Sequence, residues 1–322
     1  MANRTFTLSN GTRMPIIGYG INKFEIEQLS VKSLEVAFDS GCRNFNTAFI
    51  NSDEKILGKA ISHWIGNGIV ERKDLFITAK LAVYFNPIKS VEKFVDLSLA
   101  NLGLDYIDLY LLHLPEFCKC AEKNQCVLNQ MSSLNDDDFL AIWKGMEEMV
   151  TAGKVMNIGF ANVNSQKVSM VMKNAKIKPA VVQLEIHPFI QNLDQIKFCK
   201  QNGITVLGYA PLDDGNFCMK EKDTKSKNDR SFVNEEVIIR IARKHSKTPG
   251  QVILRHMMQG RIGPLSKTLN HTRIKENFDI FDFVLDKYDI NELDRLNKMF
   301  NPKACQFVCK KHLHLPKYLY DL

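Results

Sequence analysis

The chain has 322 residues, of which 45% are hydrophobic and 25% charged, and its formal net charge is +7. This composition is ordinary for a folded globular protein and excludes disorder over most of the length. The basic residues are spread along the chain rather than gathered in an arm or an aromatic-rich patch, so nucleic acid is not an expected partner.

Neither a secretory leader nor a membrane span is recognisable. The amino terminus has no apolar run of the signal-peptide type, and no apolar stretch reaches the roughly 18 residues that a membrane helix needs. We therefore expect a cytoplasmic protein, with its eight scattered cysteines reduced. Three of them, Cys118, Cys120 and Cys126, lie close together, but their spacing fits no zinc template, so no metal is expected.

The first predicted element is a β-hairpin over residues 5–16, because an Asn10-Gly11 pair stands between two strand-like flanks. Eight short apolar, strand-like runs follow, starting near residues 16, 44, 75, 106, 156, 181, 205 and 262. Most gaps between them carry segments of helical period, such as residues 30–38 and 138–150. This alternation predicts a single α/β domain over residues 1–322, a (β/α)8 TIM barrel whose N-terminal end the hairpin plugs.

An open doubly wound sheet is the alternative fold, but the sequence offers no glycine fingerprint for it. Gly18-Tyr19-Gly20 is followed by Ile21, Asn22 and Lys23, which does not match G-x-G-x-x-G. Residues 116–137, 213–231 and 301–322 show no regular pattern. The first two stretches follow the fourth and seventh strands, so we expect long loops on the C-terminal face, where barrel ligands bind, and the third is a C-terminal tail.

Seven phrases identify the chain, from about residue 6 to 282, as similar to the aldo-keto reductases: LSNGTRMPIIGYG, ERKDLFITAKL, LGLDYIDLYLLHLP, GKVMNIGFANVN, VVQLEIHPFIQ, GITVLGYAPL and SKTLNHTRIKENFDIFDF. The resemblance implies a barrel that holds NADP(H) extended across its C-terminal face. It also implies hydride transfer to a carbonyl carbon, with a tyrosine that protonates the oxygen and a lysine, an aspartate and a histidine that assist.

Two of those four catalytic positions are changed here. The resemblance places the lysine on Lys80 and the histidine on His113, but it places the aspartate on Asn46 and the tyrosine on Asn51. An amide does not donate a proton at neutral pH, and loss of a positioned general acid costs about 10²- to 10⁴-fold in rate. Without a carboxylate at position 46, a buried Lys80 should have a lowered pKa, which leaves it open as proton donor or as Schiff-base nucleophile.

The cofactor positions implied by the resemblance are largely kept. Asn162 and Gln183 match the contacts to the nicotinamide carboxamide, and Tyr209 matches the ring that stacks on the nicotinamide. The adenine end is matched by Lys267, Thr268, Arg273, Glu276 and Asn277. A lysine and an arginine at one phosphate favour NADPH over NADH.

Three functions therefore remain open. The chain is expected to bind NADP(H) with impaired or altered carbonyl reduction. Alternatively, it is an active reductase that takes its proton from Lys80, His113 or water, or it is a non-catalytic binding or structural protein. In each case we expect a monomer, and a small carbonyl or apolar molecule as the ligand.

Overall fold

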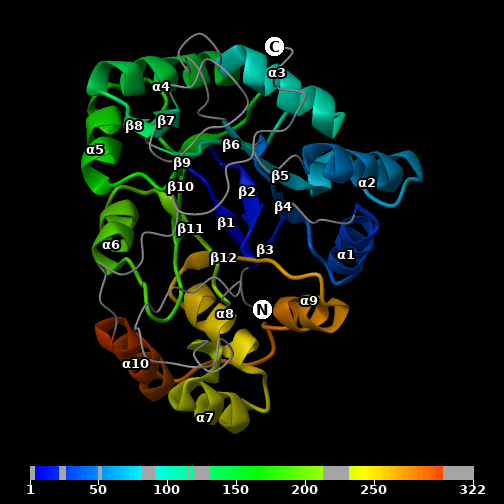
Figure 1. The fold of residues 1–322 in the computed structure, drawn as a ribbon, viewed down its shortest axis with the longest axis vertical. Helices are drawn as coiled ribbons and strands as arrows, with labels where there is room; N and C mark the ends of the chain where they lie inside the picture. The colour runs from blue at the N-terminus through cyan, green and yellow to red at the C-terminus, as the bar shows by residue number, and fades with distance from the viewer. Residues whose placement is uncertain are drawn as a thin grey trace.

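The computed structural model describes residues 4–21, 27–49, 53–81, 91–114, 116–118, 131–212 and 232–299. Eight parallel strands close into a barrel in the order β10-β11-β12-β3-β4-β5-β6-β9 (Figure 1). The predicted (β/α)8 barrel is confirmed. Its strands are β3 (Gly18–Gly20), β4 (Asn44–Asn46), β5 (Phe76–Leu81), β6 (Leu109–Leu112), β9 (Ile158–Ala161), β10 (Val181–Glu185), β11 (Thr205–Tyr209) and β12 (Ile262–Ser266).

The first, third, fourth and fifth barrel strands begin at residues 18, 76, 109 and 158, slightly later than predicted. Apolar residues precede these strands without joining the ladder. Ile107, for example, makes only an isolated bridge to Val155. Hydrophobicity alone therefore places a strand more reliably than it places its first residue.

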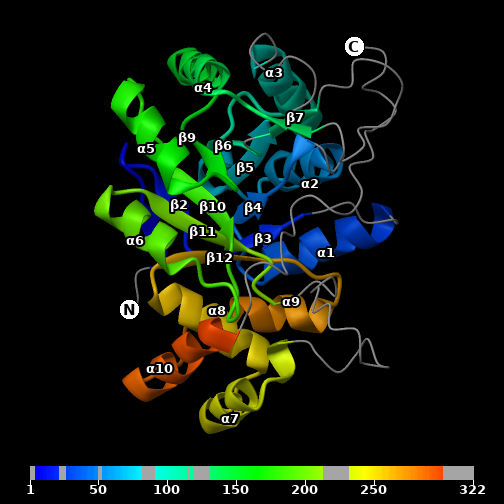
Figure 2. The same ribbon diagram turned by 60° about the vertical axis from the view of Figure 1, so that its left-hand side comes forward.

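Helices surround the barrel on all sides, as the two ribbon views show (Figures 1 and 2). The predicted helices 30–38 and 138–150 correspond to α1 and α4, which are both longer. None of the helices in the described ranges has the length and apolar character needed to cross a bilayer. The helices are α1 (Glu27–Asp39), α2 (Glu54–Gly66), α3 (Val91–Leu102), α4 (Asp136–Thr151), α5 (Ser165–Asn174), α6 (Leu193–Gln201), α7 (Glu236–His245), α8 (Pro249–Gln259), α9 (His271–Phe278) and α10 (Lys287–Arg295), with short 3-10 turns at Arg72–Asp74, Phe232–Asn234 and Leu296–Met299.

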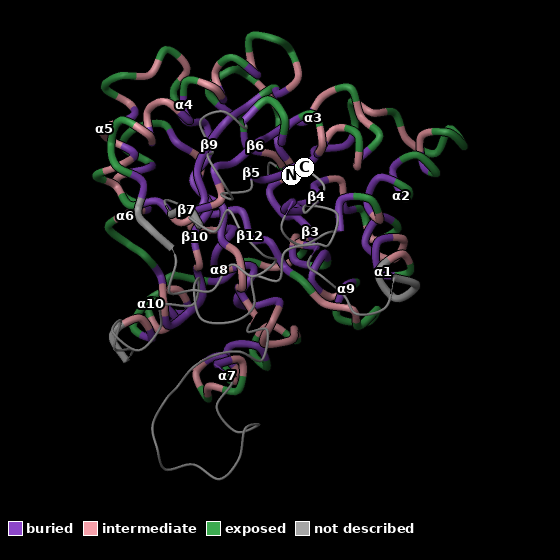
Figure 3. Tube along the Cα trace, turned by 45° about the horizontal axis from the view of Figure 1, so that its top comes forward, coloured by how far each residue is buried: buried purple, intermediate pink, exposed green. Residues whose placement is uncertain are grey.

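The strands form the most buried part of the molecule, and exposed residues lie on the outer helices (Figure 3). All six residues of β5 are buried, as expected for a parallel strand covered on both faces. Outside the barrel, Trp143 of α4 packs on Phe160 of β9 with ring centroids 4.5 Å apart. Such contacts fix each helix against the strands and so fix the ends of the strands, where polar side chains gather.

The predicted hairpin is present and lies at the amino-terminal ends of the barrel strands. Its strands β1 (Thr5–Thr7) and β2 (Arg13–Pro15) pair antiparallel. Asn10 Nδ2 donates to the carbonyl of Met156 at 3.1 Å, just before β9. Asn44 Nδ2, at the start of β4, donates to the last carbonyl of β2 at 3.0 Å. The hairpin therefore covers the end of the barrel opposite to the predicted ligand site.

The prediction that residues 116–137 lack secondary structure is wrong in part. Two short strands, β7 (Glu116–Cys118) and β8 (Met131–Ser133), pair antiparallel there, and α4 begins at Asp136. Each strand is only three residues long, too short to show an alternating pattern in the sequence. Residues 119–130, 213–231 and 300–322 lie outside the described residues, and so does Asn51.

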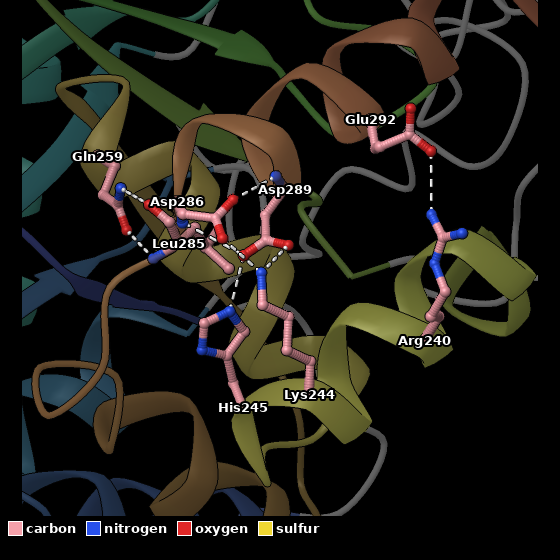
Figure 4. A network of polar contacts seen from close by, with 8 residues as sticks. All are labelled: Arg240, Lys244, His245, Gln259, Leu285, Asp286, Asp289 and Glu292. Atoms are coloured by element: carbon pink, nitrogen blue, oxygen red, sulfur yellow. Dashed lines mark hydrogen bonds and ion pairs between the residues drawn. The ribbon is translucent and has the colours of Figure 1, made fainter.

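Helix α10 is held against α7 and α8 by a network of polar contacts (Figure 4). The carboxylate of Asp289, which is 1% exposed, lies 2.8 Å from both Lys244 Nζ and His245 Nε2. Gln259 of α8 makes two hydrogen bonds to the backbone of Leu285. These contacts fix the last described helix on the outside of the barrel.

A substitution at Gly58 tests the packing of α2 on α3. A Cβ added there would lie 2.5 Å from the carbonyl oxygen of Asn101 and 2.9 Å from backbone atoms of Leu102. We expect Gly58→Ala to lower the free energy of unfolding by about 1–3 kcal/mol in urea titrations, because the two helices must separate. In the control Gly66→Ala, on the same helix, the added Cβ has no neighbour within 4 Å, so this variant should be neutral or gain up to about 1 kcal/mol. Equal effects of the two variants would contradict this packing.

Candidate functional site

Polar side chains stand at or just beyond the carboxyl ends of most barrel strands. Because the strands are parallel, these side chains share one end of the barrel, opposite the hairpin. The structure thus brings together residues that lie far apart in the sequence. They are Asn46 on β4, Lys80 on β5, His113 after β6, Asn162 after β9, Gln183 on β10, Tyr209 on β11 and Lys267 after β12.

Lys80 is the buried cation of this site, with 6% of its surface exposed. Its Nζ donates to Asn46 Oδ1 at 2.6 Å and to the backbone carbonyl of Thr47 at 2.9 Å. Both acceptors are neutral. Burial lowers the pKa of Lys80 to about 8, although the nearby carboxyl groups of Asp53 and Glu54 oppose the change. At neutral pH most of the Lys80 population is therefore still an ammonium, with a proton that is easily lost.

Asp53 and Glu54 are buried carboxyl groups at the start of α2, with 2% and 1% of their surfaces exposed. The Thr47 hydroxyl donates to Asp53 Oδ1. Burial raises the pKa of Asp53 to about 7, with the Thr47 hydrogen bond and the Lys80 charge acting against that rise and Glu54 adding to it. Burial also raises the pKa of Glu54, whose oxygens accept from Ser98 and Asn101 of α3.

The His113 side chain lies beside this group. Burial lowers its pKa to about 3, and the charge of Lys80 acts in the same direction, so the ring is neutral at physiological pH. Its buried Nδ1 has no hydrogen-bond partner among the described residues. The backbone carbonyl of His113 accepts from Asn162 Nδ2 at 3.2 Å, which ties the end of β6 to the end of β9.

Asn162, Gln183 and Tyr209 form the opposite side of the site. Asn162 has a left-handed backbone, with φ 60°, and its N–H donates to the carbonyl of Gln183 at 2.9 Å. The Tyr209 hydroxyl donates to Asn162 Oδ1 at 2.8 Å. Gln183 Nε2 is buried and has no protein partner within the described ranges. A buried amide donor of this kind is fitted to bind a carbonyl oxygen of a ligand.

The turn after β12 and helix α9 carry the five residues expected at the adenine end: Lys267 and Thr268 in the turn, and Arg273, Glu276 and Asn277 on the helix. Lys267 and Arg273 are exposed, and Asn277 is 4% exposed. The carbonyl of Thr268 accepts from the Tyr19 hydroxyl at 2.7 Å, which attaches the turn to β3. Two cations beside a helix amino terminus form a favourable surface for a phosphate.

The aldo/keto reductase family model matches residues 16–298, which is most of the chain. The chain belongs to this family. It is 31% identical over 310 residues to aldo-keto reductase family 1 member C15 of Rattus norvegicus, covering 95% of this chain and 94% of that protein. It is 33% identical over 300 residues to an NAD(P)H-dependent D-xylose reductase of Candida tropicalis, covering 91% and 92%.

Solved structures of family members share the fold over more than nine-tenths of the chain. The aldose reductase of Schistosoma japonicum superimposes with a TM-score of 0.82 at 29% identity, covering 98% of this chain and 99% of that one. A Bombyx mori aldo-keto reductase in complex with NADP gives a TM-score of 0.80 at 28% identity, covering 92% and 94%. The resemblance seen in the sequence is confirmed, and so is the fold that it implies.

The sequence analysis did not single out Asp53, nor did it foresee the hydrogen bonds that join Asn162 to Tyr209 and His113. Nothing in the local pattern marks Asp53 as buried, because acidic residues at a helix start are usually exposed and favour the helix dipole. Its burial goes with its contact to the Thr47 hydroxyl, which the folded structure brings beside the start of α2. Of the two asparagines that the resemblance places where an aspartate and a tyrosine are expected, Asn46 is described and Asn51 is not.

The lowered pKa of His113 predicts a pH dependence of stability. Since the pKa is lower in the folded state, its stabilising contribution is present above the unfolded value of about 6.5 and is lost as the pH falls toward the folded value. Urea unfolding of the wild type and of His113→Gln at about pH 7.5 and pH 5 should show that the wild type loses about 2 kcal/mol relative to the variant. An unchanged difference between the two proteins would mean that His113 is not held neutral by the fold.

Proposed function

We propose that this protein binds NADP(H) across the carboxyl ends of the barrel strands and that its carbonyl-reductase activity is impaired or altered. Its ligand would be a small carbonyl or apolar molecule in the space beside Lys80 and His113. Family membership and the NADP complex of the Bombyx mori relative support the cofactor. The altered activity is supported by the hydrogen-bond partners of Lys80, because both of them, Asn46 Oδ1 and the Thr47 carbonyl, are neutral.

The residues present fit a nicotinamide dinucleotide. Gln183 Nε2 supplies a buried donor without a protein partner, and Asn162 is held beside it by the Tyr209 hydroxyl and by its own backbone bond. The Tyr209 ring would lie against the nicotinamide. At the other end, the guanidinium of Arg273 and the ammonium of Lys267 would bind the 2′-phosphate.

The contact between Lys80 Nζ and Asn46 Oδ1 is the observation that supports impaired or altered carbonyl reduction. When bound, NADPH supplies a hydride, so reduction of a carbonyl still requires a proton for its oxygen. The chain has asparagine where the family has the phenol, at Asn51, and where it has the carboxylate beside the lysine, at Asn46. Neither amide donates a proton at neutral pH, and the neutral Asn46 oxygen does not hold the charge of Lys80 as a carboxylate would.

A second candidate is an active reductase in which Lys80 donates the proton. The pKa of Lys80, about 8 because of burial, supports it, since a general acid works best when its pKa lies near the working pH. His113 is a poorer donor, because a ring with a pKa of about 3 carries no spare proton on its acceptor nitrogen at neutral pH. The two candidates differ in one observable, which is NADPH oxidation by simple aldehydes in the unaltered protein.

Cofactor selectivity should depend on Arg273. Replacing it by methionine removes the bidentate partner of the 2′-phosphate, and hydrogen bonds to charged groups are worth about 1.5–3 kcal/mol. In fluorescence titrations, Arg273→Met should therefore bind NADPH about 10- to 100-fold more weakly and NADH unchanged. The matched control is Lys275→Met, another exposed cation on α9, which should leave both affinities unchanged. Equal weakening of NADPH and NADH by Arg273→Met would argue against a 2′-phosphate contact.

Restoring both changed positions should raise catalysis. We expect Asn46→Asp combined with Asn51→Tyr to increase NADPH-dependent reduction of an aromatic aldehyde by about 10²- to 10⁴-fold, because the phenol again donates the proton. The loss of NADPH absorbance measures the rate. Asn46→Asp alone is the control and should remain near the wild-type rate. A double variant that binds NADPH but is inert on a broad aldehyde panel would show that the two amides are not what limits the reaction.

A further inference from the structure

The buried ammonium of Lys80 needs a negative charge that its direct partners do not provide. Its two described hydrogen bonds end on neutral oxygens, those of Asn46 and Thr47. The effective penalty for an uncompensated buried charge is several kcal/mol, and a lysine in that state usually loses its proton. A compensating charge is therefore to be sought within a few ångströms of these partners.

One buried carboxyl group is linked to Lys80 through a single residue. Thr47 accepts from Lys80 Nζ with its backbone carbonyl and donates with its hydroxyl to Asp53 Oδ1. Asp53 Oδ2 is buried as well and has no hydrogen-bond partner among the described residues. Asp53 thus lies on the same side of the strand end as Lys80 and is not neutralised by any other cation in the described part of the chain.

The neighbouring carboxyl group is engaged elsewhere. Glu54 accepts from Ser98 Oγ at 2.8 Å and from Asn101 Nδ2 at 3.0 Å, both on α3. The other titratable groups that face Lys80 and these carboxyls are His113 after β6, neutral at physiological pH, and Tyr110 of β6, whose pKa burial raises. Two carboxyl groups therefore face one cation, and of the two Asp53 is the one joined to it through Thr47.

We propose that Asp53 supplies the negative charge that Asn46 lacks and is a positioning residue that keeps Lys80 protonated. This inference rests on the proposed function, because it concerns the same lysine. The electrostatics agree with the geometry: Asp53 exerts the larger of the two attractive effects on the Lys80 ammonium, ahead of Glu54. On this proposal, the countercharge of Lys80 comes from the start of α2 instead of the end of β4. Since the pKa of Asp53 is itself raised to about 7 by burial and that of Lys80 is lowered to about 8, both groups are predominantly charged only in the narrow range between these two values.

The test is the pH midpoint of Lys80, read from the ¹³Cε resonance of labelled lysine in the full chain without cofactor. The resonance is assigned by its absence in Lys80→Met. In Asp53→Asn the midpoint should fall by about one pKa unit or more, a tenfold or greater loss of proton affinity, because the main attractive charge is gone. Glu54→Gln should lower it less. Asp194→Asn removes an exposed carboxylate on α6 and should leave it unchanged. An unchanged midpoint in Asp53→Asn would overturn the proposal.

A double variant that places the carboxylate at position 46 instead of position 53 distinguishes an electrostatic role of Asp53 from a structural one. In the double variant Asn46→Asp with Asp53→Asn, a carboxylate lies in direct contact with Lys80, and the midpoint should return to the wild-type value or exceed it. A midpoint that stays as low as in Asp53→Asn would mean that Asp53 only shapes the start of α2, against the proposal.

A reciprocal measurement covers the case in which Asp53→Asn fails to fold. In Lys80→Met the ¹³Cγ resonance of Asp53 should titrate at a higher pH than in the wild type, because an attractive positive charge is lost. No change would overturn the proposal. Both titrations use protein without NADPH, so a failure of the proposed cofactor binding would leave their outcome readable and is distinguishable from a failure of this inference.

Discussion

The buried ammonium of Lys80 at the carboxyl end of β5 is the constraint on which the rest of the site depends. A charge at this depth is tolerated only when its protons are bonded and an opposite charge lies near. Here the bonds go to the Asn46 side chain and the Thr47 backbone, while the charge comes from Asp53 and Glu54 at the start of α2. The same lysine helps to keep His113 neutral, so the protonation states around the barrel mouth are coupled.

The hydrogen bonds on the two sides of the site involve different residues. The hydrogen bonds among His113, Asn162 and Tyr209 involve neither Asn46 nor Asn51, so the proposed cofactor site does not depend on either asparagine. On the side of Lys80, the resemblance implies one phenol and one carboxylate at positions where this chain has Asn51 and Asn46. The proposal therefore places the altered chemistry on the Lys80 side and leaves the residues proposed to bind the cofactor unchanged.

Most of the fold could be predicted from the sequence, because eight apolar runs separated by helical segments leave few arrangements. Strand starts were less certain, since residues such as Ile107 are apolar without joining the ladder. The short pair β7 and β8 was missed for lack of pattern length. Of the site, the structure brings Asn46 and Lys80 into contact and His113 beside them, at the strand ends where the sequence places these residues. The burial of Asp53 was not predictable, because it depends on how the start of α2 meets Thr47 after β4 rather than on local sequence.

The most direct test of the account is to titrate the unaltered protein with NADPH, following intrinsic fluorescence, and to assay the same sample for NADPH oxidation by simple aldehydes. The account predicts saturable binding with no turnover, or with turnover about 10²- to 10⁴-fold below that of a family member with the tyrosine in place. Saturable binding with turnover equal to that of such a relative would contradict it, because the proton would then reach the substrate without the phenol.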